Sequence, residues 1–159
     1  MTNKYFELAP SEIIQDINHI SFRERVLIRE IELWVHPNVY PSDRFRSSHF
    51  ILETIESMVS DKTICDMGCG MGVIGQFALH NGAKRIVQAD INVHAIENAI
   101  DNRELHGFSE KQLSIYESDC FDNVPKEKFD LIIFNIPFHS EQVIIKNPLE
   151  RAFHDPGFC

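Results

Sequence analysis

Two glycine spacings overlap in the stretch DMGCGMGVIG, and each would hold a different ligand. Gly70-x-Gly72-x-x-Gly75 spells the dinucleotide fingerprint, in which backbone N–H groups at the start of a helix hold a pyrophosphate. The same stretch also has an acid, Asp66, followed by glycines at alternate positions from Gly68 onward. Positions without a side chain let the backbone approach a ligand closely, and such a ligand does not have to carry a phosphate.

A second stretch that could do chemistry is Asn135-Ile136-Pro137-Phe138, which follows the apolar residues LIIF. It combines an amide side chain, backbone carbonyls that accept hydrogen bonds, and an aromatic ring that can stack on a planar group. Asn close to a proline is also an ordinary turn former. Ligands bind at the ends of apolar strands in a parallel α/β sheet, so the functional interpretation is favoured here.

These stretches lie in a region where short apolar runs alternate with helical patterns, from Lys62 onward. The runs predict strands at Thr63–Met67, Arg85–Asp90, Leu113–Glu117 and Asp130–Phe134. Helices are expected between them, one ending before Gly82 and one spanning Asn92–His106 before Gly107. Alternating strands and helices indicate a doubly wound α/β fold, with a parallel sheet, helices on both faces and ligands at the carboxyl ends of the strands.

The end of the first strand decides between the two glycine spacings. A dinucleotide fold needs its first glycine where the strand ends, because the chain must turn at once toward the pyrophosphate. The strand is expected to end at Met67, so the first available glycine is Gly68, and a count from there puts Val73 in the third position. The fingerprint from Gly70 begins two residues late, which disfavours a nicotinamide-dependent dehydrogenase.

The alternate glycines do not stand alone. ICDMGCGMGVIG resembles motif I of the class I S-adenosylmethionine-dependent methyltransferases, and VQADINVHAIENAIDN and YESDCFD resemble the next two elements of that family. FDLIIFNIPFH resembles motif IV, the N-P-P-[YF] signature of enzymes that methylate an exocyclic or amide nitrogen. NVYPSDRFRSSHFILETI is similar to the first conserved segment of release-factor glutamine and ribosomal-RNA guanine N2 methyltransferases, a loop expected to close over the cofactor.

The resemblance implies S-adenosylmethionine as the cofactor and a Rossmann-like sheet of four strands in the order 3-2-1-4. It implies that Asp90 holds the ribose hydroxyls, with Ile91 beside it, and that Asp119 accepts from the adenine amino group. The predicted cofactor-binding residues are Asp66, Gly68, Cys69, Gly70, Gly72, Asp90, Ile91, Asp119, Cys120 and Asn135. From the residues alone, Asp90 could instead cap the following helix, and Asp122 competes with Asp119.

The resemblance also implies roles for the catalytic stretch. The Asn135 Oδ1 atom and the Ile136 carbonyl would accept hydrogen bonds from the substrate nitrogen, and Phe138 would stack on the substrate. Ile136 stands where the family has proline, but it precedes Pro137 and is therefore still biased to an extended backbone. Catalysis would rest on positioning and on acceptors aimed at developing charge, with no strong general base.

The N-terminal part predicts a helical extension. Ser21 to Glu24 reads as a capping box, and the apolar residues that follow, up to Trp34, recur at near-helical spacing. A loop is expected over Val35–Ser48 and then a helix from Ser47 or Ser48. The inner faces of this helix and of the helix at 92–106 are predicted to carry Ile51, Ile55, Met58, Val59, Ile96, Ala99 and Ile100. We therefore divide the chain into a helical extension over residues 1–46 and a methyltransferase domain over residues 47–159.

The composition bounds the class of protein. A chain of 159 residues that is 43% apolar can bury one core, and a net charge of −9 argues against broad capture of a nucleic-acid backbone. The sequence has no 18-residue apolar run and no basic-then-apolar leader, so we expect a cytoplasmic protein without membrane contact. The four cysteines are scattered, which predicts reduced thiols and no metal site.

The expected strand order leaves LIIF at an open edge of the sheet. An apolar edge strand invites pairing with another chain, so we expect a further C-terminal segment or a second chain to complete the sheet. The functional hypothesis is methyl transfer from S-adenosylmethionine to a planar nitrogen of an RNA base, a protein glutamine or a small molecule. The alternative is a non-catalytic cofactor-binding subunit of a methyltransferase complex.

Overall fold

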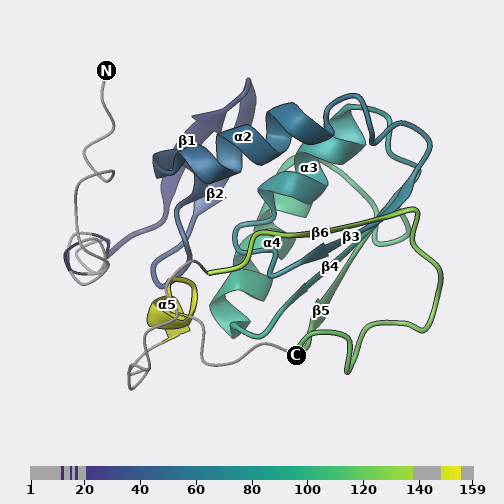
Figure 1. Cartoon of the computed structure of the whole chain (residues 1–159). Coiled ribbons are helices and arrows are strands. Elements are labelled where there is room, and N and C mark those ends of the chain that lie inside the picture. Colours follow the sequence, from purple (N-terminus) through teal and green to yellow (C-terminus); the bar gives the residue numbers. More distant parts are fainter. Residues whose placement is uncertain (1–11, 13–14, 16, 18–20, 138–147, 155–159) are drawn as a thin grey trace.

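The computed structural model describes residues 12, 15, 17, 21–137 and 148–154 (Figure 1). Its elements are β1 (Glu24–Ile28), β2 (Ile31–Val35), η2 (Ser42–Arg44), α2 (Arg46–Ile55), β3 (Thr63–Met67), α3 (Val73–His80), β4 (Arg85–Asp90), α4 (Val93–Leu105), β5 (Leu113–Glu117), β6 (Leu131–Phe134) and α5 (Pro148–Arg151). Four strands form a parallel sheet in the order β5-β4-β3-β6, and β1 and β2 form a separate hairpin. The predicted doubly wound α/β fold and its strand order are confirmed.

The two faces of the parallel sheet are covered differently. Ile64 and Ile86 face a core shared with α2 and α3, and the helices α2, α3 and α4 pack side by side (Figure 1). On the opposite face, Cys65 and Val87 pack with Val124 of the segment that connects β5 and β6. Helices were expected on both faces. Within the described residues they lie on one face, and a loop covers the other.

The predicted helix over the first apolar residues is wrong in the described part. Residues 24–35 form an antiparallel hairpin, turning at Arg29 and Glu30, whose φ angles are 46° and 68°. Two consecutive left-handed residues make the tight turn that matches the twist of paired strands. Burial in β2 alternates, with Ile31, Leu33 and Val35 buried. Apolar residues of the hairpin also recur at near-helical spacing, and this concealed the two-residue period of β2.

The hairpin belongs to the same core as the sheet. Ile28 and Leu33 pack in one cluster with Leu52 of α2 and Ile64 of β3. Residues on both sides of position 46 therefore share a hydrophobic interior. The division into residues 1–46 and 47–159 stays a prediction.

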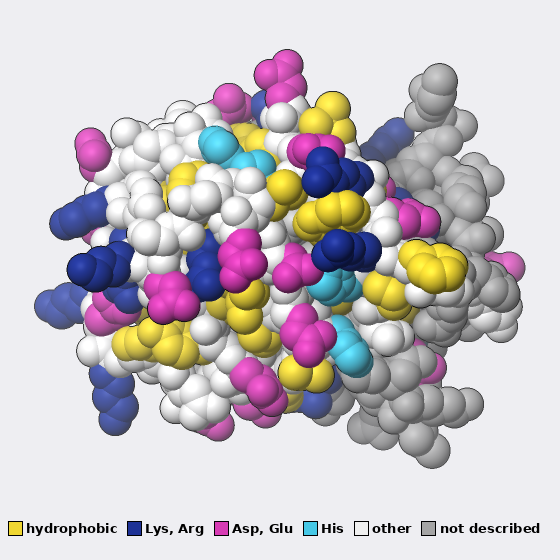
Figure 2. All heavy atoms as spheres, turned by 180° about the vertical axis from the view of Figure 1, so that it is seen from behind, with side chains coloured by type: hydrophobic (Ala, Val, Ile, Leu, Met, Phe, Trp, Pro, Cys, Tyr) yellow, Lys and Arg dark blue, Asp and Glu magenta, His cyan; other side chains and the backbone are white. Residues whose placement is uncertain are grey.

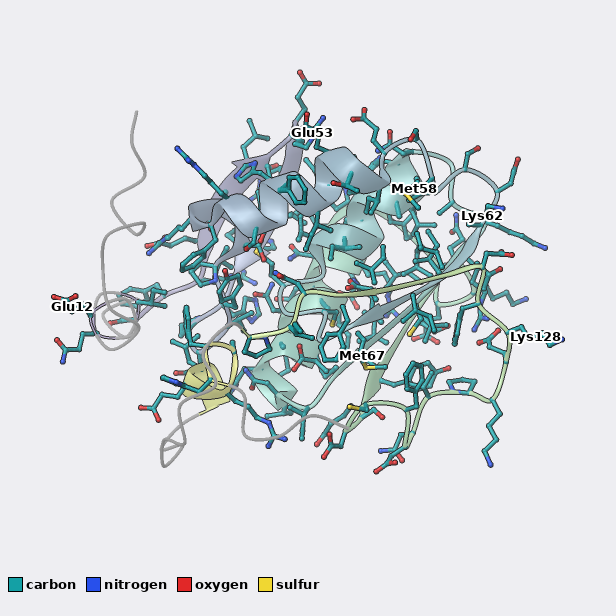
Figure 3. All side chains as sticks on the ribbon, viewed as in Figure 1. Glu12, Glu53, Met58, Lys62, Met67 and Lys128 are labelled. Carbon is teal, nitrogen blue, oxygen red and sulfur yellow. The ribbon has the colours of Figure 1, made fainter. Side chains whose placement is uncertain are left out.

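The inner faces of two helices differ from the predicted ones. In α2 and the turn after it, the buried residues are Ser48, Leu52, Ile55 and Val59, whereas Met58, labelled in Figure 3, is 47% exposed. In α4 they are Ala95, Asn98, Ala99 and Asn102, whereas Ile96 and Ile100 are only half-buried. Two buried asparagines in place of isoleucines mean that α4 meets polar backbone groups on its inner side.

The cysteines divide into two kinds. Cys65 and Cys69 are free and buried. Cys120 is disulfide-bonded, so the expectation of reduced thiols is wrong at this position. Among residues that the structure describes, no three His, Cys, Asp or Glu side chains gather to hold a metal ion, and no helix has the length and apolarity needed to cross a membrane.

Candidate functional site

The residues predicted to bind and act lie along one edge of the parallel sheet. Met67, labelled in Figure 3, is the last residue of β3 and pairs with Ala89 of β4 and Phe134 of β6. Asp90, at the end of β4, pairs with Glu117 at the end of β5. The four strands are parallel, so the segments that follow them all leave the sheet at this carboxyl edge.

The chain leaves β3 through a bend made of left-handed glycines. Gly68, Gly70 and Gly72 have φ angles of 65°, 54° and 81°. The Gly72 N–H donates to the Cys69 carbonyl at 2.8 Å, and the Cys69 N–H donates to the Ala89 carbonyl at 3.0 Å. Other residues rarely adopt this conformation, which explains the alternating glycines. The bend begins directly after Met67, as the register predicts.

The glycines of this bend face different surroundings. A Cβ atom at Gly68 would lie 3.1 Å from the Phe134 ring, and one at Gly72 would lie 3.2 Å from the Ala99 Cβ. A Cβ at Gly70 would meet nothing within 4 Å. Gly68 and Gly72 therefore make room for the protein itself, whereas Gly70 presents bare backbone to open space.

Asp90 ties the end of β4 to the bend. Its Oδ2 accepts a hydrogen bond from the Gly70 N–H at 2.9 Å, and its Oδ1 accepts one from the Asn92 N–H at 2.9 Å. Burial raises the pKa of Asp90, while the N–H donors and Arg151 oppose that rise. Each carboxylate oxygen has a second lone pair, so further hydroxyl donors can be accepted. Asn92, not Asp90, caps α4, because its side chain accepts from the His94 N–H at 3.1 Å.

Asp66 lies beneath the bend. Its side chain is 0% exposed, and its Oδ2 accepts from the Gln88 Nε2 at 2.7 Å. Burial raises the pKa of Asp66 to about 7, against the opposing effect of the Gln88 hydrogen bond. In this structure the Asp66 carboxyl is linked to the bend through Gln88, which also donates to the Gly72 carbonyl. A direct contact of Asp66 with a cofactor stays a prediction.

The segment after β5 is organised by a serine that sequence reasoning missed. The buried Ser118 donates from Oγ to the Cys120 carbonyl at 2.9 Å and accepts from the Asn123 N–H at 2.9 Å. Its N–H donates to the Asp90 carbonyl at 2.9 Å, which holds this segment beside β4. The side chains of Asp119 and Asp122 are both exposed at this edge. The predicted adenine contact of Asp119, with Cys120 beside it, remains untested.

The predicted catalytic stretch begins where β6 ends. Asn135 and Pro137 are half-buried, and Ile136 is 48% exposed. Asn135 directly follows Phe134, whose ring lies against Gly68. The structure therefore brings Asn135 and the glycine bend to adjacent strand ends. Phe138 lies outside the described residues.

Two asparagines of α4 link the hairpin to the glycine bend. The Asn102 Oδ1 accepts from the Trp34 N–H at 2.7 Å, and its Nδ2 donates to the Trp34 carbonyl and to the Met71 carbonyl, each at 2.8 Å. Asn98 accepts from the His36 N–H at 2.8 Å and donates to the Trp34 carbonyl at 2.7 Å. Their spacing of four residues, one helical turn, is the only signal in the sequence that they share a face.

The sequence matches a family model that agrees with this fold and site geometry. Residues 30–156 match the model described as the methyltransferase small domain. The chain belongs to the methyltransferase small domain family. This range includes β2, the glycine bend and the Asn135 stretch, so the family covers all the parts of the site described above.

Curated relatives of this small methyltransferase domain are named for different acceptors. A Methanocaldococcus jannaschii protein, provisionally named a protein N5-glutamine methyltransferase, is 37% identical over 128 residues, which are 79% of this chain and 61% of that protein. The ribosomal RNA large subunit methyltransferase G of Aliivibrio fischeri is 33% identical over 128 residues, 79% of this chain and 34% of that protein. The chain thus spans less than two thirds of either relative.

A solved structure shares the fold of this domain. The Thermus thermophilus 16S rRNA N2 G1207 methyltransferase, in complex with AdoMet and guanosine, superposes with a TM-score of 0.63 at 21% identity, over 82% of this chain and 36% of that one. The resemblance to class I methyltransferases inferred from the motifs is confirmed.

Proposed function

We propose that this domain binds S-adenosylmethionine and transfers the methyl group to a planar nitrogen. The observation that carries the proposal is the contact between the glycine bend and β6, where Gly68 lies against Phe134 and Asn135 follows. A bare-backbone surface and an amide acceptor thereby meet at one sheet edge. The names of the two relatives support the proposal, since one is named for a protein glutamine and the other for ribosomal RNA, both among the acceptor classes expected for this motif.

The residues at the edge fit this cofactor. Gly70 exposes backbone where a side chain would fill the space, and Asp90 offers carboxylate lone pairs at the end of β4. The bend begins directly after Met67, which fits the methyltransferase motif and not the dinucleotide fingerprint that starts at Gly70. The residues that would hold the cofactor are Gly68, Cys69, Gly70, Gly72, Asp90, Ile91, Asp119 and Cys120. When bound, the cofactor supplies an electrophilic methyl group on a sulfonium.

The chain's own part in the reaction is to position the acceptor nitrogen. An amide or aromatic amino nitrogen has a delocalised lone pair, and two hydrogen-bond acceptors on its N–H groups draw it toward a more nucleophilic geometry. The Asn135 Oδ1 atom and the Ile136 carbonyl are the acceptors we assign to this task, with Pro137 keeping Ile136 extended. These acceptors also stabilise positive charge as it develops on the nitrogen.

Among possible acceptors, a glutamine amide fits this chain best. The net charge of −9 opposes extended contact with an RNA backbone. On the face seen in Figure 2, basic side chains gather along the left edge with acidic ones beside them, and acidic side chains also lie over the middle. The M. jannaschii relative, at 37% identity, carries the name of a glutamine methyltransferase. A guanine amino group is the second acceptor to test.

The test is transfer of a labelled methyl group from S-adenosylmethionine to a panel of glutamine-containing proteins and of ribosomal RNA, comparing the wild type with Asn135→Ala. We expect the variant to lose most transfer, about 100-fold, and only a small part of its affinity for S-adenosylhomocysteine. Asn81→Ala is the matched control, because Asn81 lies at the C-terminal end of α3, away from the carboxyl ends of the strands where the site lies. Equal transfer by wild type and Asn135→Ala would favour the non-catalytic subunit instead.

A further inference from the structure

Gln88 is buried between the strands and the glycine bend, and neither the motifs nor the mechanism uses it. It lies in β4 and is 0% exposed. Its Nε2 donates to the Asp66 Oδ2 at 2.7 Å and to the Gly72 carbonyl at 3.1 Å. One amide group therefore bonds to the end of β3 and to the residue that caps α3.

Two glycines, Gly72 and Gly75, leave room for the Gln88 side chain. A Cβ at Gly75 would lie 2.6 Å from the Gln88 Nε2, closer than real Cβ contacts, and one at Gly72 would lie 3.2 Å from the Gln88 Oε1. Gly75 is helical, so it is not needed for backbone conformation, unlike Gly72 with its φ of 81°. The absence of a side chain at Gly75 makes room for the Gln88 amide and, less tightly, for Ile86, whose Cγ2 would lie 3.1 Å from such a Cβ. This accounts for the fourth glycine of the stretch.

We propose that Gln88 is a positioning residue for the cofactor, and that Gly75 is its steric counterpart: together they hold Gly72 and Asp66 so that the bend keeps its binding shape. The proposal rests on the proposed cofactor function. The Gly72 carbonyl is drawn toward Gln88, and the Gly72 N–H closes the bend on Cys69. Since Asp66 accepts from the same Nε2, the charge state of one carboxyl controls how firmly the amide is held.

The groups around Asp66 make a pH readout interpretable. The pKa of Asp66 is raised to about 7: burial is the main cause and the Asp90 charge adds to the rise, while the hydrogen bond from Gln88 opposes it. The nearby thiols stay protonated near neutral pH, because burial raises the pKa of Cys65 to about 12 and that of Cys69 well above its usual value. Asp66 is the group in this cluster whose pKa is raised to about 7; burial also raises the pKa of Asp90, which bonds to Gly70 and not to Gln88.

The test is calorimetric affinity for S-adenosylhomocysteine from pH 6 to pH 8.5, for wild type, Gln88→Leu, Gly75→Ala, Gln88→Ala and the double variant Gly75→Ala/Gln88→Ala. Wild-type affinity should fall as pH drops through about 7. Gln88→Leu keeps a similar volume but cannot donate, so affinity should fall about tenfold at pH 8 and should no longer change as pH passes through about 7, because the amide that bonds to the Asp66 carboxyl is gone. If Gln88 served packing alone, the Gln88→Leu variant would keep the pH dependence of the wild type.

The double variant tests the steric pairing. Gly75→Ala should weaken binding about tenfold in the wild-type background and have little effect beside Gln88→Ala, where the methyl group fills vacated space. Additive losses, or a pH dependence retained in Gln88→Leu, would overturn this proposal while wild-type binding stands. If wild type binds no S-adenosylhomocysteine, the proposed function itself fails. Circular dichroism of each variant separates lost binding from lost folding.

Discussion

The Asp90 carboxylate accepts a hydrogen bond from the Gly70 N–H at 2.9 Å, so the acid that ends β4 holds the middle of the bend that leaves β3. The same carboxylate is the one predicted to hold the ribose. Two roles in one group mean that its removal both frees the bend and takes away a ligand contact.

Asp90→Ala is therefore expected to weaken S-adenosylhomocysteine binding by about 100-fold or more, a loss of ~3 kcal/mol, since hydrogen bonds to a charged group are the stronger kind. Titration calorimetry measures this. Glu53→Gln on the exposed side of α2, labelled in Figure 3, should bind like the wild type. A loss below threefold in Asp90→Ala would contradict the assignment.

Alanine at Gly70 and at Gly72 should separate binding from stability. At Gly70 the methyl group enters open space, so only the left-handed backbone is strained, at about 1 kcal/mol of unfolding free energy, while ligand access is blocked. At Gly72 the methyl group also meets Ala99, and about 2–4 kcal/mol should be lost. Urea unfolding and calorimetry of both variants check this. A Gly70→Ala protein that binds normally would place the cofactor elsewhere.

Asp66 should make the unfolding free energy depend on pH in an unusual direction. Its pKa is raised to about 7 in the folded state, so the folded state binds the proton more tightly than the unfolded chain, and this group's contribution falls as pH rises from about 4 to about 7. Asp66→Asn removes this decline, which could reach ~4 kcal/mol. The measurement is the difference between wild type and Asp66→Asn in urea unfolding at pH 5 and pH 8. If the difference in unfolding free energy were the same at both pH values, the pKa of the Asp66 carboxyl would not be raised in the folded state.

Asn102→Leu should loosen the hairpin and the bend together. It removes a side chain that bonds to both Trp34 backbone groups and to the Met71 carbonyl, so a loss of about 2–4 kcal/mol in unfolding free energy is expected. Hydrogen exchange of the Trp34 amide should quicken, and S-adenosylhomocysteine affinity should fall. Asn123→Leu, in the segment after β5, is the comparison that leaves the hairpin untouched. Unchanged exchange at Trp34 would rule out this link.

The sequence by itself determined the parallel sheet and the bend. The predicted bounds of β3, β4 and β5 agree with the structure, because each is a short apolar run closed by a turn or a charge, and such runs carry their own boundaries. The glycines at positions 68, 70 and 72 were readable for a similar reason, since a left-handed backbone restricts the residue type locally.

Only the tertiary structure decided the rest. The hairpin was missed because the apolar residues near its start fit both a helical and a two-residue period. The packing of β2 on α4 favours the strand. The partners of Gln88 and Asn102 were invisible, because a buried amide is defined by carbonyls and carboxylates that lie 16 and 22 residues away for Gln88 and 31 and 68 for Asn102. Local pattern specifies backbone shape, whereas hydrogen bonds between distant segments exist only once the chain has folded and excluded water from them.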